Sequence, residues 1–475
     1  VGLDYLTLSR SSGTLSGGES QRIRLATQIG SSLMGVLYIL DEPSIGLHSR
    51  DTSRLIKVLR QLQQLGNTVV VVEHDEEIIR AADYIIDVGP HAGRLGGQIV
   101  YQGDMHDLQP GTESHTVRYL LDEETIAVPA TRRPWNNYIE VRGARHHNLK
   151  GIDVKFPLNV MTVVTGVSGS GKSSLINGTL VPIISHKLYR SYAQPLRYDT
   201  IEGLEHIDKL VVVDQSPIGR TPRSNPATYS NVFSDIRKLF EATPDAQVRG
   251  FKAGRFSFNV RGGRCEECRG AGVQTIEMNF LPDVYVRCKA CGGNRYNRET
   301  LEVKYKGKNI NEVLNMTVNI AVDFFANIPS IYQKLKAIQD VGLGYLTLNR
   351  TSNSLSGGES QRINLATSLG SSLVGSLYIL DEPSIGLHSR DTERLIKVLK
   401  QLRDMGNTVI VVEHDKDMML AADHIIAPGP MAGRKGGEVV FMGTPEEMLR
   451  THTLTSQYLN GVMKIEVPAE RRKGN

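Results

Sequence analysis

The sequence lacks several features that mark whole classes of protein. It has no continuous apolar run of about 18 residues or more, the length that a membrane-spanning helix requires. Residues 1–10 contain no basic segment followed by an apolar one, which excludes a secretory signal peptide there, and no initiator methionine. Apolar residues make up 40% of the chain and charged residues 22%, as in ordinary globular proteins. We therefore expect a cytoplasmic protein without a membrane partner.

Cysteine is scarce as well. The chain of 475 residues has only 4 cysteines, all between Cys265 and Cys291. Structural disulfides of a secreted protein would be spread more widely along the chain. Two close pairs of cysteines instead indicate a reducing compartment and a bound metal ion.

The net charge is small, but the charges are unevenly distributed. Lys and Arg number 55 and Asp and Glu 51, which gives +4. Residues 216–300 alone contain 14 basic and 8 acidic residues. A local basic surface is a candidate footprint for nucleic acid, although the same balance also occurs on ordinary solvated faces.

An internal repeat organises the chain. Residues 1–52 and 341–392 align without a gap at an offset of 340, and 42 of the 52 positions are identical. The likeness continues through residues 67–86 and 407–426. A period this long does not fit a solenoid, so it indicates two copies of one domain.

The two copies are not equivalent. A glycine-rich loop, Gly166–Ser174, precedes the repeated segment of the second copy, whereas no such loop precedes that of the first. We therefore expect residues 1–128 to be the C-terminal part of a first domain whose phosphate loop is missing. Residues 129–140 would be a linker, and residues 141–470 a second domain that carries an insertion at about 216–300.

The second copy has the pattern of an α/β domain. Residues 160–165 form an apolar, β-branched run that leads into the glycine-rich loop and then into a helix start. Residues 209–214, 376–381 and 408–413 are further short apolar runs, as in strands that are buried on both faces of a mainly parallel sheet. Residues 392–406 between them form an amphipathic helix that ends at a glycine.

The glycine-rich loop matches the phosphate-binding pattern GxxxxGK[ST] in its required position between a strand and a helix. Its glycines let successive backbone N–H groups converge on phosphate oxygens at a helix N-terminus. Lys172 would reach the β- and γ-phosphates of ATP, and the Ser173 hydroxyl would bind Mg²⁺. The candidate nucleotide-binding residues of this loop are Gly166, Ser168, Gly169, Gly171, Lys172, Ser173 and Ser174.

Two acidic residues follow the apolar run at 376–380. Asp381, at the end of the predicted strand, can hold Mg²⁺, and Glu382 can polarise the attacking water or accept its proton. Acid pairs at strand ends are common for other reasons, so the position of this pair after a phosphate loop is what favours catalysis.

The segment LSGGESQ occurs in both copies, and it is the most specific motif of the chain. It places Ser16, Gly17 and Gly18 in the first copy, and Ser356, Gly357 and Gly358 in the second. Serine and two glycines at a helix start can be a simple cap, but they also leave backbone N–H groups free to bind a γ-phosphate. With LDEP about 25 residues later in each copy, the chain resembles the ATP-binding-cassette superfamily.

This resemblance implies roles for further residues. His414 would contact the γ-phosphate and the catalytic water, and Gln215 would contact Mg²⁺ and the water. It also implies composite sites, in which Ser16–Gly18 of the first copy close over the phosphate loop of the second. Asp41, Glu42, His74 and Ser356 would then belong to a second site whose phosphate loop is missing, so we expect impaired ATP turnover in this chain.

The four cysteines form two CxxC pairs, Cys265 with Cys268 and Cys288 with Cys291, separated by an alternating segment typical of a hairpin. This pattern favours one tetrahedral Zn²⁺ over an iron–sulfur or redox site, with a structural role for the metal. Basic and aromatic residues surround the cysteines in the sequence and are candidates for contact with DNA: Arg261, Arg264, Arg269, Arg287, Lys289, Arg295 and Arg298, and Phe280, Tyr285 and Tyr296. Core packing is the other explanation for the aromatic residues.

A cassette with a four-cysteine module between phosphate loop and signature resembles the UvrA family. Residues 225–272, both DEPSIGLH segments and the GPxAGxxGG segments near residues 89 and 429 carry the resemblance, which covers nearly the whole chain. It implies a dimeric ATPase that recognises damaged double-stranded DNA and loads UvrB in nucleotide excision repair. It also implies that the first phosphate loop and the UvrB-binding domain belong to a missing N-terminal part.

Three alternatives remain open at this stage. A UvrA-like paralogue could protect against DNA-modifying drugs, since the second copy repeats DEPSIGLH and EHD where the family more often has DEPTTGLH and EHN. A transporter ATPase subunit would share the nucleotide motifs but not the cysteine module. An ATP-gated scaffold without turnover would share all of them.

Overall fold

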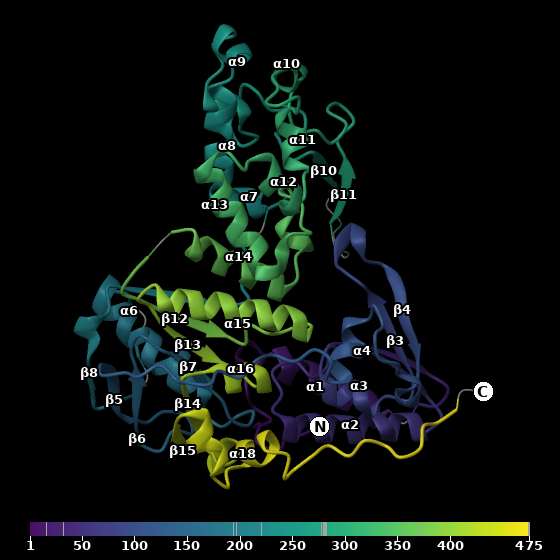
Figure 1. The fold of residues 1–475 in the computed structure, drawn as a ribbon, viewed down its shortest axis with the longest axis vertical. Coiled ribbons are helices and arrows are strands. Elements are labelled where there is room, and N and C mark those ends of the chain that lie inside the picture. The colour runs from purple at the N-terminus through teal and green to yellow at the C-terminus, as the bar shows by residue number, and fades with distance from the viewer. Residues whose placement is uncertain are drawn as a thin grey trace. The chain divides into compact units, whose positions relative to one another are not determined.

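The computed structural model describes residues 1–473 apart from residues 16, 32, 193, 196, 220, 277, 279–282 and 372. The chain forms two compact units (Figure 1). Unit 1 contains Val1–Asp214 and Leu373–Asn475, and unit 2 contains Gln215–Ser372. Within the described ranges, none of the helices combines the length and the apolar character needed to cross a bilayer.

The centre of unit 1 is a six-stranded sheet that belongs to the second copy. Its strand order is β15-β14-β7-β13-β12-β9, and all neighbours are parallel except β14 and β15. The strands are β7 (Met161–Val164), β9 (Lys209–Val213), β12 (Ser376–Asp381), β13 (Thr408–Val412), β14 (His424–Gly429) and β15 (Glu438–Gly443). This confirms the mainly parallel sheet. β9 differs from the expectation of burial on both faces, because it is an edge strand with Val212 38% exposed.

A smaller antiparallel sheet, β6-β5-β8, packs with the large one in unit 1. Val154 and Phe156 of β6, Leu175 after the phosphate loop and Ile410 of β13 are all buried in one apolar cluster. The remaining elements of the second copy in this unit are β5 (Tyr138–Ala144), β6 (Ile152–Pro157), β8 (Thr200–Glu202), α5 (Lys172–Leu175), α6 (Val181–Tyr189), α15 (Ser389–Asp404), α16 (Lys416–Ala421), α17 (Pro445–Leu449) and α18 (Leu454–Leu459). The phosphate loop thus begins at a strand that is enclosed on both sides.

The first copy forms the rest of unit 1 and has less sheet. β1 (Leu37–Asp41) pairs in parallel with β2 (Thr68–Val72), and β3 (Ile85–Gly89) pairs antiparallel with β4 (Gln98–Gly103). Its helices are α1 (Gly17–Gly30), α2 (Ser49–Gln64), α3 (Glu76–Ala81) and α4 (His115–Leu120). Among the described residues, no strand joins β2 to β3 in the way that β7 joins β13 to β14.

The same pentapeptide, LYILD, therefore has two environments. Leu377 and Ile379 of β12 are 0% and 1% exposed, whereas Leu37 and Ile39 of β1 are 57% and 69% exposed. The sequence is identical, so the difference comes from the neighbouring elements and not from local preference.

Unit 2 is mainly helical and contains the cysteine module. Its aromatic core includes Phe233 stacked on Phe258, with ring centres 5.1 Å apart, and Tyr305 stacked on Phe325. The elements are α7 (Pro226–Tyr229), α8 (Val232–Glu241), α9 (Pro244–Val248), β10 (Val273–Ile276), β11 (Val284–Arg287), α10 (Arg298–Glu302), α11 (Ile310–Leu314), α12 (Val318–Phe324), α13 (Pro329–Ile338) and α14 (Gly357–Leu369). β10 and β11 form the hairpin that the sequence predicts between the two CxxC pairs.

Two tails in unit 1 cross reciprocally between the copies. Residues 128–133 read VPATRR and residues 467–472 read VPAERR. In the first tail, Arg132 donates to the carbonyls of residues 420 and 422, and the Arg133 amide donates to Asp423, 3.0 Å away. In the second tail, Arg471 donates to the carbonyl of residue 82 and the Arg472 amide donates to Asp83. Each copy therefore binds the other through the same backbone turn.

We predict that Asp423→Ala destabilises unit 1 by about 3–5 kcal/mol, because it removes a buried ion-pair partner. The carboxylate of Asp423 accepts from the amides of Arg133 and Met161 and from Arg403, whose Nη1 lies 2.8 Å away. The matched control is Asp83→Ala, which should cost about 1–2 kcal/mol because its side chain is 19% exposed. Denaturation followed by the fluorescence of Trp135, the only tryptophan, measures both. Equal losses of stability would contradict the prediction.

Candidate nucleotide and metal sites

The loop Gly166–Ser174 has the backbone shape that its glycines predict. Gly166, Gly169 and Gly171 have φ angles of 141°, 77° and 113°, in the region that favours glycine. A Cβ on Gly166 would lie 2.3 Å from the carbonyl oxygen of Pro428. Any side chain there would therefore displace the loop from β14.

A second turn of the chain supports this loop. The Gly433 amide donates to the Gly169 carbonyl at 2.9 Å, and the Gly437 amide donates to the Ser170 carbonyl at 3.0 Å. Asn148 Nδ2 donates to the Gly169 carbonyl at 3.1 Å. The repeated GPxAGxxGG segment thus has a structural role that sequence reasoning did not assign, and Asn148 carried no signal.

Lys172 begins α5 and lies inside the loop. Its Nζ donates to the carbonyls of Gly166 and Val167, at 2.7 and 3.0 Å. Burial lowers the pKa of Lys172 to about 8, although Glu382, Asp51 and Asp381 act in the opposite direction. Ser173, the predicted magnesium ligand, follows in α5 and is exposed.

The acid pair lies at the end of β12, as predicted. Burial, together with the adjoining Glu382, raises the pKa of Asp381 to about 6. Glu382 has a φ of 47°, which is unusual for a residue with a side chain, and burial raises its pKa against the effect of Lys172. His414 Nε2 lies 3.5 Å from Glu382 Oε1. Burial and Lys172 hold the pKa of His414 well below 6.5, so the ring is neutral.

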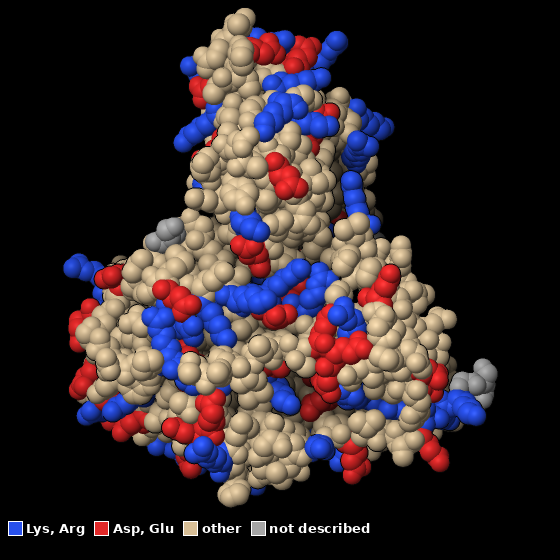
Figure 2. All heavy atoms as spheres, viewed as in Figure 1, with Lys and Arg blue, Asp and Glu red and all other residues tan. Residues whose placement is uncertain are grey.

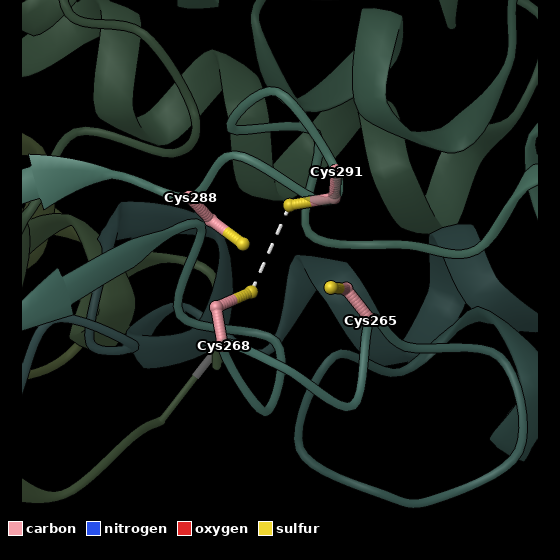
Figure 3. Close-up of side chains that lie close together, drawn as sticks. All are labelled: Cys265, Cys268, Cys288 and Cys291. Carbon is pink, nitrogen blue, oxygen red and sulfur yellow. Dashed lines mark hydrogen bonds between the residues drawn. The ribbon is translucent and has the colours of Figure 1, made fainter.

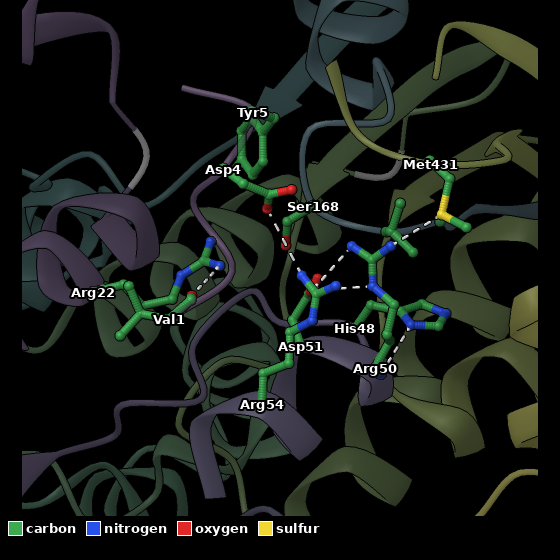
Figure 4. A network of polar contacts seen from close by, with 12 residues as sticks. Val1, Asp4, Tyr5, Arg22, His48, Arg50, Asp51, Arg54, Ser168 and Met431 are labelled. Atoms are coloured by element: carbon green, nitrogen blue, oxygen red, sulfur yellow. Dashed lines mark hydrogen bonds and ion pairs between the residues drawn. The ribbon is translucent and has the colours of Figure 1, made fainter. Parts of the chain in front are cut away.

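Residues of the first copy lie directly against these groups. A Cβ on Gly46 would lie 2.7 Å from Glu382 Oε2, and Ser168 Oγ donates to the Gly46 carbonyl at 3.4 Å. Figure 4 shows Tyr5 and Ser168 together in a close-up of the polar contacts around Arg50 and Asp51. A Cβ on Gly169 would lie 2.8 Å from the Tyr5 ring, and Tyr5 donates to Glu19 on α1. Sequence reasoning missed Tyr5, although it recurs as Tyr345.

The signature segment of the first copy is described in part. Ser16 lies outside the described residues, and Gly17 begins α1. Gly18 is packed against the carbonyl of Ile45, where a Cβ would lie 2.5 Å away. The start of α1 and the loop that carries Gly46 are therefore in contact, which leaves no room for a side chain at Gly18.

The signature segment of the second copy lies in unit 2. Ser356 caps α14 in a reciprocal arrangement with Glu359: Ser356 Oγ accepts from the Glu359 amide, and Glu359 accepts from the Ser356 amide. Gly357 and Gly358 follow at the helix start. Gln215 lies beside Gly357, whose Cβ position is 3.4 Å from Gln215 Oε1. The roles of these residues at a nucleotide remain predictions.

Glu42 and His74, the corresponding pair in the first copy, differ from Glu382 and His414 in exposure and in pKa. His74 Nε2 lies 3.5 Å from Glu42 Oε1, and a Cβ on Gly386 would lie 2.9 Å from the same oxygen. The His74 side chain is 37% exposed, against 8% for His414. Because the hydrogen bond with Glu42 outweighs the effect of burial, the pKa of His74 is raised. Asp41, which precedes Glu42, ends β1.

The four cysteines converge as the CxxC pairs predict (Figure 3). Their sulfur atoms all lie within 4.8 Å of one another, and Cys268 Sγ is 3.7 Å from Cys291 Sγ. This distance is far longer than a disulfide bond. It is close to the edge of a tetrahedron with metal–sulfur bonds of about 2.3 Å, the zinc–thiolate length. Cys265, Cys268 and Cys288 are buried, so the donor set fits a structural Zn²⁺.

The basic residues around the cysteines divide into two groups. Arg261, Arg269, Arg287, Lys289 and Arg298 are exposed. Arg264 pairs with Glu266 at 3.0 Å, with only 10% of its side chain exposed. Arg295 corrects the expectation of a basic surface residue, because it is 5% exposed and lies over the Phe258 ring. Figure 2 shows Lys and Arg side chains on the visible face of unit 2, with Asp and Glu side chains among them.

The aromatic candidates near the cysteines differ in exposure. Tyr285 is 48% exposed on β11, whereas Tyr296 is 2% exposed and donates to the Phe256 carbonyl. Phe280 lies outside the described residues. Core packing therefore explains Tyr296, and Tyr285 remains a candidate for contact with nucleic acid.

The sequence is similar to curated proteins named UvrABC system protein A. It is 59% identical over 464 residues to UvrABC system protein A of Streptococcus mutans, which covers 97% of this chain and 49% of that protein. It is 57% identical over 467 residues to UvrABC system protein A of Staphylococcus aureus strain COL, again over 49% of that protein. The chain thus spans about half the length of the curated relatives it matches. No protein-family model matches the sequence.

Comparison of the structure agrees. The crystal structure of UvrA2 from Deinococcus radiodurans superposes with a TM-score of 0.89 and 50% identity, over 98% of this chain and 56% of that one. A model of ribosome-bound archaeal Pelota and ABCE1 matches with a TM-score of 0.52 and 18% identity, over 93% of this chain and 58% of that one, which supports the fold alone. The fold is that of the ATP-binding-cassette ATPases.

We predict that His74 is protonated at a higher pH than His414. A raised pKa in the folded state means that His74 stabilises the fold fully below its unfolded pKa of about 6.5, and that this contribution is lost as pH rises through the folded value. NMR titration of the histidine rings measures both groups. Glu42→Gln should lower the pKa of His74, because it removes the carboxylate. The matched variant Glu382→Gln should leave His414 neutral. A protonated His414 at pH 7 would contradict this prediction.

We predict one zinc ion per chain, lost in Cys268→Ser. Binding of structural zinc is worth about 10–16 kcal/mol in small metal-folded peptides, so the module should unfold locally when the metal is removed. Metal analysis by mass spectrometry and release by a chelator measure the stoichiometry. Arg261→Ala, which changes an exposed side chain of the same module, is the control and should keep its zinc. Stoichiometric zinc in Cys268→Ser would refute the assignment.

Proposed function

We propose, on the premise that this chain belongs to the UvrA family, that it is an ATPase whose nucleotide state controls binding to damaged double-stranded DNA. The observation that carries the proposal is the contact between the first copy and the second copy's phosphate loop. Gly46 lies against Glu382 and Ser168, and Tyr5 lies against Gly169. A nucleotide there would meet residues of both copies, as a composite cassette site requires.

We assign the chemistry at this loop to the following groups. Lys172 binds the β- and γ-phosphates, whose negative charge restores the positive charge that burial disfavours. Ser173 and Asp381 would hold Mg²⁺, which would supply positive charge beside the phosphate oxygens.

The attacking water is activated by two groups in this proposal. Glu382 accepts its proton, helped by a pKa that burial raises. The neutral His414 holds Glu382 and the water in line, since its Nε2 is 3.5 Å from the carboxylate. The first copy contributes the backbone amides of Gly17 and Gly18, at the start of α1, to the γ-phosphate. Asp41, Glu42 and His74, the counterparts of Asp381, Glu382 and His414, belong to a second half-site in the first copy.

The cysteine module is the proposed DNA-contacting surface. Zn²⁺ fixes the hairpin β10–β11, and exposed basic residues around it contact phosphates: Arg261, Arg269, Arg287, Lys289 and Arg298. Arg295 is excluded from this role because it is buried. We further propose the setting that the family implies, which is a cytoplasmic homodimer that loads UvrB during nucleotide excision repair.

The experiment that tests this function measures DNA affinity across a salt series, with and without ATP. We expect Arg269→Ala and Lys289→Ala each to weaken binding and to lower the salt slope by about 1, the value for one lost phosphate contact. Lys397→Ala, an exposed lysine on α15 paired with Glu393, is the control and should change neither. Tighter binding to damaged than to intact duplex, altered by ATP, supports the repair function.

Two further outcomes decide between functions. Lys172→Ala should abolish both ATP binding and the effect of ATP on DNA. If ATP alters DNA binding but the wild-type chain never hydrolyses it, the chain is an ATP-gated scaffold. Equal affinity for damaged and intact duplex at all salt concentrations would contradict damage recognition.

A further inference from the structure

The loop that follows the acid pair in the first copy reaches into the second copy. It runs from Ser44 to His48, the N-cap of α2. Gly46, in its middle, lies against Glu382 and Ser168, as described above. Gly46 has a φ of 65°, so the backbone itself makes this contact. Side chains at the ends of the loop therefore hold it in this position.

His48 fixes the C-terminal end of the loop by two hydrogen bonds. Its Nδ1 accepts from the Arg50 amide at 3.2 Å, which caps α2. Because Nδ1 is an acceptor, the proton of the neutral ring is on Nε2, and Nε2 donates to Thr455 Oγ1 at 3.0 Å. His48 is 3% exposed and Thr455 is 5% exposed. The bond is thus made away from solvent.

The partners of the ring belong to the second copy. The Tyr458 ring, on α18 like Thr455, meets His48 edge-on with ring centres 5.7 Å apart. The ring of His414 lies on another side, 6.3 Å away and perpendicular. We call Thr455, Tyr458 and His414 the socket of His48.

Charged groups around the ring favour its neutral form. Burial lowers the pKa of His48 to about 3, and His414, Lys172 and Arg50 act in the same direction. Asp51 acts against them, but its carboxylate is paired with Arg50 at 3.0 Å (Figure 4). The ring therefore keeps the tautomer that the socket requires at neutral pH.

The same arrangement occurs in the opposite direction. His388 Nε2 lies 3.1 Å from Thr116 Oγ1, and the Tyr119 ring meets His388 edge-on at 5.5 Å. Thr116 and Tyr119 lie on α4 of the first copy. Gly386 of this loop lies against Glu42. Both copies of the repeat thus place a histidine, a threonine and a tyrosine in one geometry, which indicates a built contact and not incidental packing.

We propose that His48 is a positioning residue of the nucleotide site at Gly166–Ser174. Seated in its socket, it holds Gly46 against Glu382, and so sets the position of the carboxylate that activates water. This inference rests on the proposed function of Glu382 and extends it to α18, an element far from the phosphate loop in sequence. The socket also contains His414, so the histidine beside Glu382 and the anchor of the loop share one packing contact.

The test separates the two hydrogen bonds of His48. In His48→Asn, the shorter side chain keeps an acceptor for the Arg50 amide, since asparagine is a good helix cap, but it cannot reach Thr455. We expect the single-turnover rate of ATP hydrolysis to fall about 10-fold or more in both His48→Asn and His48→Ala, because misplacement of a catalytic group costs rate. ATP affinity should change by less than about 3-fold, as expected when transition-state interactions alone are lost.

His388→Asn is the matched control. His388 makes the same two hydrogen bonds, but its loop lies against Glu42 of the first copy, whereas the loop of His48 lies against Glu382. Its hydrolysis rate should therefore fall clearly less than that of His48→Asn. Thr455→Val should reproduce the loss in His48→Asn, because it removes the acceptor at nearly constant shape. A wild-type rate in His48→Asn, or equal losses in His48→Asn and His388→Asn, would overturn the proposal.

A second measurement keeps the proposal testable if the wild-type chain does not hydrolyse ATP. That result would contradict the proposed ATPase function without deciding the role of His48. NMR of the histidine ring nitrogens, with a non-hydrolysable ATP analogue and Mg²⁺, decides it. The His48 resonance should shift when the analogue binds, the His388 resonance should not, and Lys172→Ala should abolish the shift. An unchanged His48 resonance in the presence of bound analogue would overturn the inference.

Discussion

The pairing of β7 between β13 and β14 is the constraint on which the rest of unit 1 depends. The strand carries the phosphate loop at its end, and it closes the sheet of the second copy. In the second copy, where β7 joins β13 to β14, the LYILD strand β12 and the side chain of His414 are buried. In the first copy, no strand corresponding to β7 lies among the described residues. There the LYILD strand β1 is more exposed, and the pKa of His74 is raised. The elements packed on the sheet therefore account for the difference in burial, and the hydrogen bond with Glu42 accounts for the raised pKa of His74.

The motifs of the phosphate loop could be read from the sequence, because their chemistry is local. A strand, three glycines and a lysine at a helix start can adopt few other structures, and Lys172 lies where the pattern places it. The four cysteines were equally informative, since two CxxC turns can bring thiols together around only one centre. Spacing within a few residues was enough in both cases.

Contacts between distant segments could not be read in this way. Nothing near Tyr5 or His48 in the sequence points to Gly169 or Thr455, because the contact depends on how two copies pack. The burial of Arg295 likewise depends on Phe258 beneath it, and charge alone suggested a surface residue. The repeat also contains these positions: Tyr5 and Tyr345 recur at the offset of 340, and the two VPAxRR tails recur at an offset of 339.

These crossed contacts link the copies at three levels. The tails join each copy to a turn of the other, the hydrogen bonds of His48 with Thr455 and of His388 with Thr116 join α18 and α4 to the loops, and Gly46 lies against the Glu382 carboxylate. Binding of a nucleotide to one copy would thus affect the other copy through packed, hydrogen-bonded groups. The proposed control of DNA binding by ATP requires such a connection.

A crystal structure with a non-hydrolysable ATP analogue and Mg²⁺ tests the composite site most directly. The account predicts that Lys172 Nζ lies within hydrogen-bond distance of the β- and γ-phosphates, and that backbone amides of Gly17 or Gly18 from the first copy meet the same γ-phosphate. An analogue at Gly166–Ser174 contacted by the second copy alone, with Gly46 withdrawn from Glu382, would contradict it.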